Sequence, residues 1–599
     1  MVKVSWRFGI LAGVIVAVFA LYPQFALWNE RGADWRGTFA SNDLDEPAYA
    51  AYLQALIDGR PRRNDPYSGR DESAENPQAE SIFSIQFLPP YLISIPARLF
   101  GFDASQTFIL LSALAGFFTA LALFWLLAQI TGDNRFAFVG SLLILFGGAL
   151  ASGNGAIKEF FGGAAYPFLP FLRRYIPAAS FPFFFAMFGF VRLSLKAEIK
   201  SPKYISAICA GLCFAFLVFS YFYLWTTAAA FLFILTLLWF ILRPENWKQA
   251  LKSILLTDVI AFLALVPYAY LLSKRAPGTD SIQLLVLTRA PDLMRTPAIV
   301  CQIAIFLIAL AAWFGFVKLK SASTIFLLAL ALVPFAVFNQ QIVTGRSLQP
   351  FHYEFYVVNY ITALVVALTL FIYLKKIRSA KIYTAILLVS GLAAIAWGYV
   401  EVKFTTRLLM FWNIEREDAL AVTKRLAELA RENPANGINA VTLNLDYVQA
   451  DNQPVFSPQT VLWARHQHVF AGVGWEENKE RFYQMLYYAD RDADWLRQDF
   501  KRGDIEAYMA LFGWDRFNAN LSVNSRPLTG GEIAEEVARY DAYYKNFSFE
   551  QASRPPLSFV VAPNNSRKDF LNLKRWYEMD AGENFGKFTL YKVKLKSAS

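Results

Sequence analysis

The fold is decided by residues 43–59, which read DLDEPAYAAYLQALIDG. Asp45 and Glu46 precede Pro47, and Gly59 closes the segment. A carboxylate before a proline is typical of a helix N-terminus, where it caps the helix and is favoured by the helix dipole, and a glycine is typical of a C-terminus. The stretch therefore predicts a short amphipathic helix lying flat on a membrane surface. Its apolar face would consist of Tyr49, Tyr52, Leu53, Leu56 and Ile57.

The composition favours a polytopic membrane protein. The chain has 599 residues, of which 56% are hydrophobic and 17% aromatic, too apolar for a soluble multidomain protein. The net charge is +10, but the basic residues form short clusters between apolar runs, which argues against a nucleic acid partner. Cys209, Cys213 and Cys301 lie inside apolar segments, so we expect packing roles and no disulfide framework or metal site.

The apolar runs predict about eleven membrane spans, because roughly 20 helical residues cross the hydrocarbon core. We interpret the first run, residues 8–27, as an uncleaved anchor and not as a signal peptide. The other predicted spans are residues 105–130, 136–152, 178–194, 204–220, 221–242, 254–272, 299–317, 324–339, 357–374 and 382–400.

The topology depends on residues 83–100, an apolar segment that contains Pro89, Pro90 and Pro96. Cytoplasmic loops are enriched in Lys and Arg, and the basic clusters share one side with the amino terminus only if this segment does not cross. It is therefore predicted to be a second juxtamembrane helix at the outer interface, kinked by its prolines. The outward-facing segments are then residues 28–104, 153–177, 273–298, 340–356 and everything after Val400.

These boundaries predict two domains. Residues 1–400 form a transmembrane domain whose first outer loop, residues 28–104, carries the two juxtamembrane helices. Residues 401–599 have the composition of a soluble extracytoplasmic α/β domain. Compact loops and modest use of glycosylation sequons favour a bacterial inner membrane with this domain in the periplasm. Within it we expect helices at 415–432, 503–512 and 531–544 and strands at 440–445, 557–561 and 588–593.

The order of these pieces resembles the GT-C superfamily of integral membrane glycosyltransferases. Residues 45–49 (DEPAY) resemble the acidic motif of protein O-mannosyltransferases. Residues 87–91 (FLPPY) through 99–101 (LFG) resemble the proline-rich helix of bacterial lipid A aminoarabinose transferases, although Leu88 stands where those enzymes have a charged residue. The resemblance implies a sugar donor on polyprenyl phosphate, an acceptor presented from the outer side, and inversion at the anomeric carbon.

The implied reaction needs a base and a phosphate-binding cation near the outer membrane surface. Asp45 matches the family's catalytic position, Asp43 is the second choice, and Glu46 would orient or cap. For the donor phosphate the best candidate is Arg346, whose outer loop also carries Gln349, His352 and Tyr353. Further candidates are the pairs Arg173–Arg174 and Lys274–Arg275. The alternative for all of these cations is anchoring at headgroup depth.

Mg²⁺ or Mn²⁺ is a candidate cofactor, but no spacing singles out a site. The possible oxygen ligands are Asp43, Asp45, Asp65, Asp71, Glu72 and Glu75, and the alternative is solvated loop charge. His466 and His468 alternate as on one face of a strand, and we assign them no zinc site.

Two other functions compete with a glycosyltransferase. A transporter or flippase for a lipid-linked glycan would place ionisable residues at mid-membrane. The predicted spans are nearly free of charge, and Asp258 lies near a predicted cytoplasmic end, which favours an enzyme acting at the outer interface. The third candidate is a catalytically silent relative that serves as an assembly scaffold.

Overall fold

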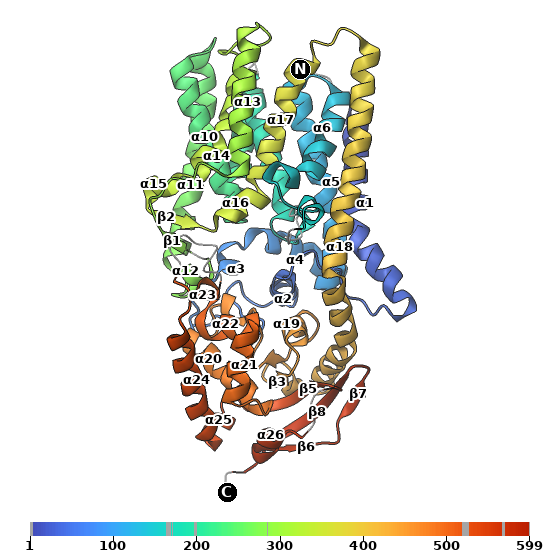
Figure 1. Ribbon diagram of the computed structural model, residues 1–599, viewed down its shortest axis with the longest axis vertical. Helices are drawn as coiled ribbons and strands as arrows, with labels where there is room; N and C mark the ends of the chain where they lie inside the picture. Colours follow the sequence, from blue (N-terminus) through green and yellow to red (C-terminus); the bar gives the residue numbers. More distant parts are fainter. Residues whose placement is uncertain are drawn as a thin grey trace.

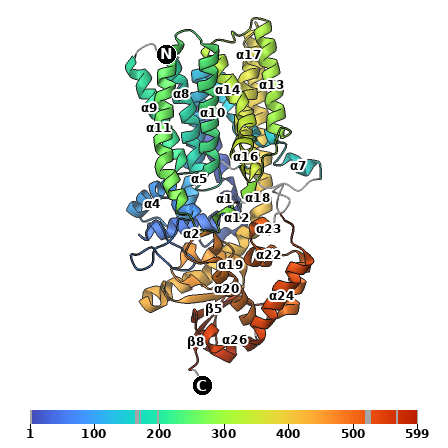
Figure 2. The same cartoon turned by 90° about the vertical axis from the view of Figure 1, so that its left-hand side faces the viewer.

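The computed structural model describes residues 4–162, 169, 172–196, 200–283, 285–517, 526–565 and 569–597. A bundle of long apolar helices stands on a smaller part made of helices and one sheet (Figure 1). The amino terminus lies at the far end of the bundle and the carboxyl terminus at the far end of the smaller part, as the second view also shows (Figure 2). The predicted class, a polytopic helical membrane protein with a C-terminal α/β domain, is confirmed.

Every predicted span coincides with a helix of the bundle. Among the described residues, 7 helices are long and apolar enough to cross a membrane, or 8 if one pair bent by 42° is a single span. Three shorter apolar helices accompany them, so the count of about eleven spans stays a prediction. The helices are α1 (Trp6–Arg31), α5 (Ala104–Thr131), α6 (Asn134–Gly147), α8 (Phe181–Lys196), α9 (Lys200–Val218), α10 (Phe222–Leu242), α11 (Trp247–Ser273), α13 (Thr296–Trp313), α14 (Ala322–Val337), the bent pair α16 (Pro350–Tyr356) and α17 (Val358–Leu374), and α18 (Ala380–Glu432).

Polar contacts fix which helix ends lie together. The main-chain N–H of Ser5 donates a hydrogen bond to Asn134 Oδ1 at 2.9 Å, which joins the amino terminus to the turn between α5 and α6. The Tyr383 hydroxyl donates to Asp133 Oδ2 at 2.7 Å, which adds the start of α18 to the same end. The start of α1 and the end of α5 therefore lie at the same end of the bundle, which is the arrangement expected if the segment between these helices does not cross.

That segment contains two helices, α3 (Ile82–Ile85) and α4 (Leu88–Phe100). Leu92, Ile95 and Leu99 of α4 are 51%, 54% and 78% exposed and fall on one side of the helix. This unpartnered apolar face suits the edge of a bilayer. The second helix predicted from the prolines is divided into a short and a longer piece, and its place at the membrane surface stays a prediction.

The first juxtamembrane helix, α2 (Glu46–Ile57), lies between α4 and α19 (Tyr447–Phe456) of the smaller part (Figure 1). Ala50, Ala51 and Leu53 are all fully buried, although they point in different directions around the helix. The expected single apolar face on a membrane surface is therefore wrong, because the C-terminal domain covers the side of α2 that was expected to meet solvent.

Helix α18 links the two parts and is continuous, so the predicted division at residues 400 and 401 falls inside it. Its last turns pack on one face of a sheet with strand order β4-β3-β5-β8-β6, where Phe559 and Val561 meet Val422 and Leu426. The alternate residues Val560 and Ala562 face the helices on the other side. The sheet contains β3 (Val441–Asn444), β4 (Thr460–Val461), β5 (Leu557–Pro563), β6 (Tyr577–Met579), β7 (Glu583–Phe585) and β8 (Phe588–Leu595), and the helices over it include α20 (Trp475–Tyr488), α21 (Ala493–Arg502), α22 (Ile505–Phe512) and α24 (Gly530–Lys545). The three strands and three helical stretches predicted here are all present.

Candidate active site

The chain between α1 and α2 is held in place by side chains from both sides. Glu417 and Asn413 of α18 and Gln24 of α1 accept hydrogen bonds from its main-chain N–H groups. The bonds are Thr38 N to Glu417 Oε2 at 3.0 Å, Ser41 N to Asn413 Oδ1 at 2.8 Å and Ala40 N to Gln24 Oε1 at 2.7 Å. Because buried main-chain groups are costly to leave unpaired, these bonds fix the path of the loop that leads to Asp43 and Asp45.

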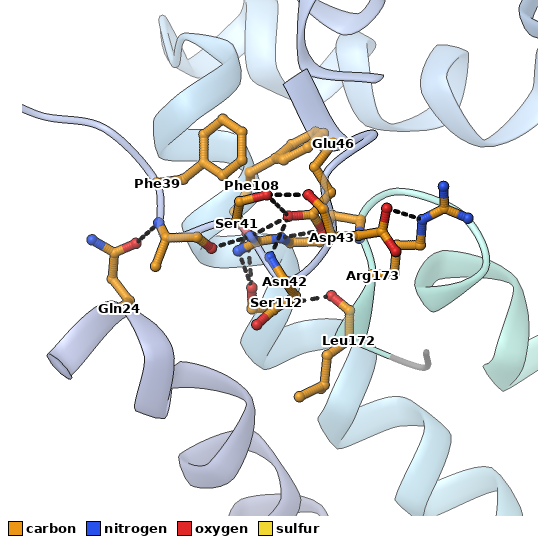
Figure 3. A network of polar contacts seen from close by, with 12 residues as sticks. Gln24, Phe39, Ser41, Asn42, Asp43, Glu46, Phe108, Ser112, Leu172 and Arg173 are labelled. Carbon is orange, nitrogen blue, oxygen red and sulfur yellow. Dashed lines mark hydrogen bonds and ion pairs between the residues drawn. The ribbon is translucent and has the colours of Figure 1, made fainter. Parts of the chain in front are cut away.

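Glu46 and Arg174 form a buried ion pair inside this loop. Their side chains are 0% and 2% exposed, with Arg174 Nη2 at 2.9 Å from Glu46 Oε2. Figure 3 shows Glu46 beside Ser41, Asn42 and Asp43. Glu46 also accepts hydrogen bonds from the main-chain N–H groups of Arg174 at 2.6 Å and Asn42 at 2.7 Å. Arg174 in turn donates to Ser112 Oγ of α5 at 2.6 Å and to the carbonyl oxygen of Ala40. All of these partners are protein groups, so the pair joins two loops to α5.

Arg173 binds the two carboxylates that precede Glu46. Its Nε lies 3.3 Å from Asp43 Oδ1, and its Nη2 contacts Asp45 Oδ2. Asp43 is buried at 2% exposure, whereas the Asp45 side chain is 49% exposed. Asp45 occupies the N-cap position of α2 but makes no capping hydrogen bond with its side chain. The carboxylate of Asp45 is thus held by a cation and open to solvent on another side.

His466 of the C-terminal domain contacts the second oxygen of Asp45. Its Nε2 lies 3.3 Å from Asp45 Oδ1, and its Nδ1 lies 2.6 Å from Asp451 Oδ2 on α19. Burial lowers the pKa of His466, but the charges and hydrogen bonds of Asp451 and Asp45 outweigh it and raise the pKa to about 9. At neutral pH the imidazole is therefore protonated, and each ring nitrogen donates to one carboxylate.

The pKa of Asp45 follows from these neighbours. The surrounding protein desolvates the carboxylate and raises its pKa, but the charge of Arg173 and the hydrogen bond and charge of His466 outweigh this, with a smaller contribution from His352. The pKa of Asp45 is therefore held well below its usual range. The site presents an ionised, half-exposed carboxylate between two cations, which can accept a proton from a hydroxyl in a transition state.

Sequence reasoning missed the role of His466. The alternation of His466 and His468 predicted a strand, but the chain forms a short 3-10 turn there, η6 (Gln467–Val469). His468 points elsewhere, with its Nδ1 at 2.7 Å from the carbonyl oxygen of Arg465. No local sequence signal marks His466, because its contacts with Asp451 and Asp45 arise when α19 packs against α2.

Three of the residues predicted for the donor phosphate gather at the start of α10, beside this cluster. They come from α16 and its N-cap and contact Tyr221, Tyr223 and Thr226; the three are His352, Gln349 and Tyr353. His352 also lies close enough to Asp45 to affect the pKa of Asp45. The contacts are His352 Nδ1 to the Tyr221 hydroxyl at 3.2 Å, the Tyr223 hydroxyl to Gln349 Oε1 at 3.4 Å, and the Tyr353 hydroxyl to Thr226 Oγ1 at 2.9 Å.

The remaining cations lie apart from this group. Arg346 is exposed on strand β2 (Arg346–Leu348), which pairs with β1 (Leu285–Leu287) at the edge of the molecule (Figure 1). Within the described part of the chain, its side chain has no hydrogen-bond or ion-pair partner. Arg275 forms an ion pair with Asp280 at 3.0 Å, and the carbonyl oxygen of Lys274 accepts from the main-chain N–H of Glu80 at 2.9 Å.

The acidic residues proposed as metal ligands do not fit a divalent cation. The described residues contain no group of three or more His, Cys, Asp or Glu that could hold a metal ion. Asp43 and Asp45 are neutralised by Arg173 and the protonated His466, which stand where a cation would bind. Of the others, Asp71 pairs with Arg60 at 2.7 Å, Glu72 accepts from Arg63 Nε at 2.7 Å, and Asp65 accepts from the main-chain N–H of Tyr67 at 2.9 Å.

A small cavity lies on the side of Asp43 that faces α18 and α19. Trp412 and Arg416 line it from α18, and Tyr447 and Asp451 line it from α19. Aromatic side chains next to charged ones are suited to contacts with the apolar faces and hydroxyl groups of sugars. The cavity therefore borders both Asp43, on the loop before α2, and Asp451, on α19 of the C-terminal domain.

Comparison with known proteins gives similarity in structure alone. No protein-family model matches the chain, and no curated protein matches it in sequence. The arabinofuranosyltransferase AftD from Mycobacteria is similar over 98% of this chain, with 12% identity and a TM-score of 0.48, and this chain spans 42% of its length. The Archaeoglobus fulgidus oligosaccharyltransferase, solved with Zn and sulfate, is similar over 96% of this chain and 72% of its own, with 11% identity and a TM-score of 0.42. By their names, the first transfers arabinofuranose and the second an oligosaccharide.

Proposed function

We propose that this protein is a glycosyltransferase that moves a sugar from a polyprenyl-phosphate donor to an extracytoplasmic acceptor. One observation carries the proposal. Asp45, an ionised and half-exposed carboxylate, is held between Arg173 and His466 at the end of the membrane bundle that meets the C-terminal domain. This is the depth at which a lipid phosphate would present its sugar and a soluble acceptor could approach it. A bacterial inner membrane with the domain in the periplasm is part of the proposal.

In this reaction the acceptor hydroxyl attacks the anomeric carbon while the bond from that carbon to the phosphate oxygen breaks. Asp45 takes the hydroxyl proton, and the phosphate leaves with the bonding electrons. Attack from the face opposite the leaving phosphate inverts the anomeric carbon. Asp45 is a weak base, so it accepts the proton only as the new bond forms. Catalysis then depends on orientation and on charge already in place.

The leaving phosphate needs cations near Asp45. Arg173 is the nearest cation, because it contacts the Asp45 carboxylate directly, and His352, which lies beside Tyr221, would add a polar contact and no charge. Gln349 and Tyr353 would add polar contacts beside His352. Arg346 is exposed and has no partner among the described residues, so it would act only if the donor itself draws it in. We leave Arg174 out of this role, because its guanidinium is fully used by Glu46, Ser112 and Ala40.

The experiment is mass spectrometry of lipid-linked sugars and surface glycans in cells with wild type, a deletion or Asp45→Asn. Asn keeps the size of Asp45 but cannot accept a proton, so we expect transfer to fall by about 10²- to 10⁴-fold. Cells with the deletion and cells with Asp45→Asn should then accumulate the same polyprenyl-phosphate sugar. In both, the same acceptor should lack the transferred sugar. Asp58→Asn, at the other end of α2, is the matched control.

Wild-type glycans with Asp45→Asn, combined with a defect in the deletion, would contradict the proposal. That outcome would support transport of a lipid-linked glycan or a scaffold role instead.

A further inference from the structure

We infer that His466 is a positioning residue for Asp45, so that the extracytoplasmic domain completes the active site of the transmembrane domain. This inference rests on the proposed function of Asp45. The two residues are 421 positions apart in the sequence, and their side chains meet at 3.3 Å between His466 Nε2 and Asp45 Oδ1. The transmembrane domain thus supplies the base, Asp45, and the C-terminal domain supplies the group that orients it, His466.

His466 is itself held rigidly. One oxygen of Asp451 lies 2.6 Å from the ring Nδ1, and the other accepts the main-chain N–H of His466 at 3.1 Å. His466 and Asp451 are 6% and 5% exposed. A carboxylate bonded to one ring nitrogen of a histidine fixes the orientation of the ring and the direction in which the other ring N–H points. The Nε2–H therefore points at Asp45 and at no other described side chain.

Asp451 is in turn fixed to the outer loop of the transmembrane domain. The Tyr67 hydroxyl donates a hydrogen bond to the main-chain oxygen of Asp451 at 3.2 Å. Nearby, Arg70 of the same loop pairs with Glu477 of α20 at 2.7 Å, and Phe83 stacks on Phe470 with ring centroids 4.5 Å apart. These contacts come from both sides of the domain boundary, so the distance from His466 to Asp45 depends on how the domain docks.

The two partners of Asp45 divide its oxygens between them. Arg173 takes Oδ2 and His466 takes Oδ1, which leaves the exposed side of the carboxylate facing the acceptor. Without His466, the carboxylate could rotate to bind Arg173 through both oxygens, the geometry that guanidinium groups favour. A rotated Asp45 would still be ionised, but its free lone pairs would no longer face the acceptor. The charged and titratable groups around His466 are Asp45, Asp451, Arg465, His468 and, through Asp45, Arg173.

The test uses the full-length protein, purified and added to membranes from the deletion strain, which hold both the accumulated donor and the unmodified acceptor. His466→Gln should lower kcat by about 10- to 100-fold, the usual effect of losing an orienting partner, with KM unchanged. His468→Gln, two residues away and bonded only to a main-chain oxygen, should keep wild-type kcat. Asp451→Asn should reproduce the effect of His466→Gln and serves in its place if that variant does not fold.

A double-mutant cycle separates positioning from a structural role. If His466 acts through Asp45, then His466→Gln should cause no further loss in an Asp45→Asn background. Equal loss in both backgrounds, or wild-type kcat for both His466→Gln and Asp451→Asn, would overturn the inference. An Asp45→Asn protein with full transfer would instead overturn the proposed function, so the two failures are distinguishable.

Discussion

Two ion pairs stand side by side in this protein, made by neighbouring residues of the same two loops. Arg174 binds Glu46, and Arg173 binds Asp43 and Asp45. The Glu46–Arg174 pair is buried, with side chains 0% and 2% exposed. The second ends in a carboxylate that is 49% exposed. The same carboxylate–guanidinium chemistry therefore serves architecture when every partner is a protein group, and can serve catalysis when one face stays open.

The difference predicts the largest effect for Arg174→Ala. Removing one member of a buried ion pair leaves the other charge uncompensated, which costs about 3–5 kcal/mol of unfolding free energy. We expect the variant to lose folded protein in detergent, measured by thermal unfolding and by yield. The control is Glu46→Met combined with Arg174→Met, which removes both charges and should recover part of the loss. A well-folded Arg174→Ala protein that had lost transfer would mean that Arg174 binds the donor phosphate after all.

Arg173→Lys should give the opposite result, with stability nearly unchanged and transfer reduced. Lysine keeps the positive charge between Asp43 and Asp45 but cannot bridge them through two separate nitrogens of a planar group. We expect turnover to fall by about 10- to 100-fold, because a misplaced carboxylate loses its alignment with the acceptor. Turnover and thermal unfolding measured on the same preparation, with Arg174→Lys beside it, would show whether the two pairs separate in this way.

The smallest effect concerns pH and distinguishes the open pair from the buried one. His466 has a folded-state pKa raised to about 9, so the stability from its pairing is fully present below its ordinary pKa of about 6.5 and is lost as pH rises through about 9. Asp45 has a lowered pKa, so its contribution is present above the ordinary value of about 4 and is lost only in stronger acid. Transfer should therefore decline on the alkaline side near pH 9 and persist in mild acid.

His466→Gln should remove the alkaline decline in transfer, because the group that titrates there is gone. It should also raise the pKa of Asp45 toward the ordinary carboxylate value, so that transfer falls at a less acidic pH than in wild type. The measurement is kcat against pH for wild type, His466→Gln and His468→Gln. An alkaline decline that persists in His466→Gln would assign it to another group.

The sequence predicted much of the fold from local signals. Each of the predicted apolar runs is a helix, and the proline-rich segment before Gly101 stays at the end of the bundle next to α2. Both follow from physical constraints that act within one segment, namely hydrophobic length and the placement of Lys and Arg. The sequence pattern of residues 46–57 correctly predicted a helix but not its burial, because no residue in this segment indicates that α19 will pack against it.

The sequence by itself predicted the apolar helices of the bundle, since hydrophobic length is written in consecutive residues. Asp45 became the candidate base through the resemblance of residues 45–49 to a family motif. Only the tertiary structure decided which arginine meets which carboxylate and that a histidine 421 positions away completes the cluster. Arg173 and Arg174 are identical in type and adjacent in sequence, so their roles are separated by the directions in which the folded loop points them. Contacts of that kind arise from packing between distant segments, and no local pattern encodes them.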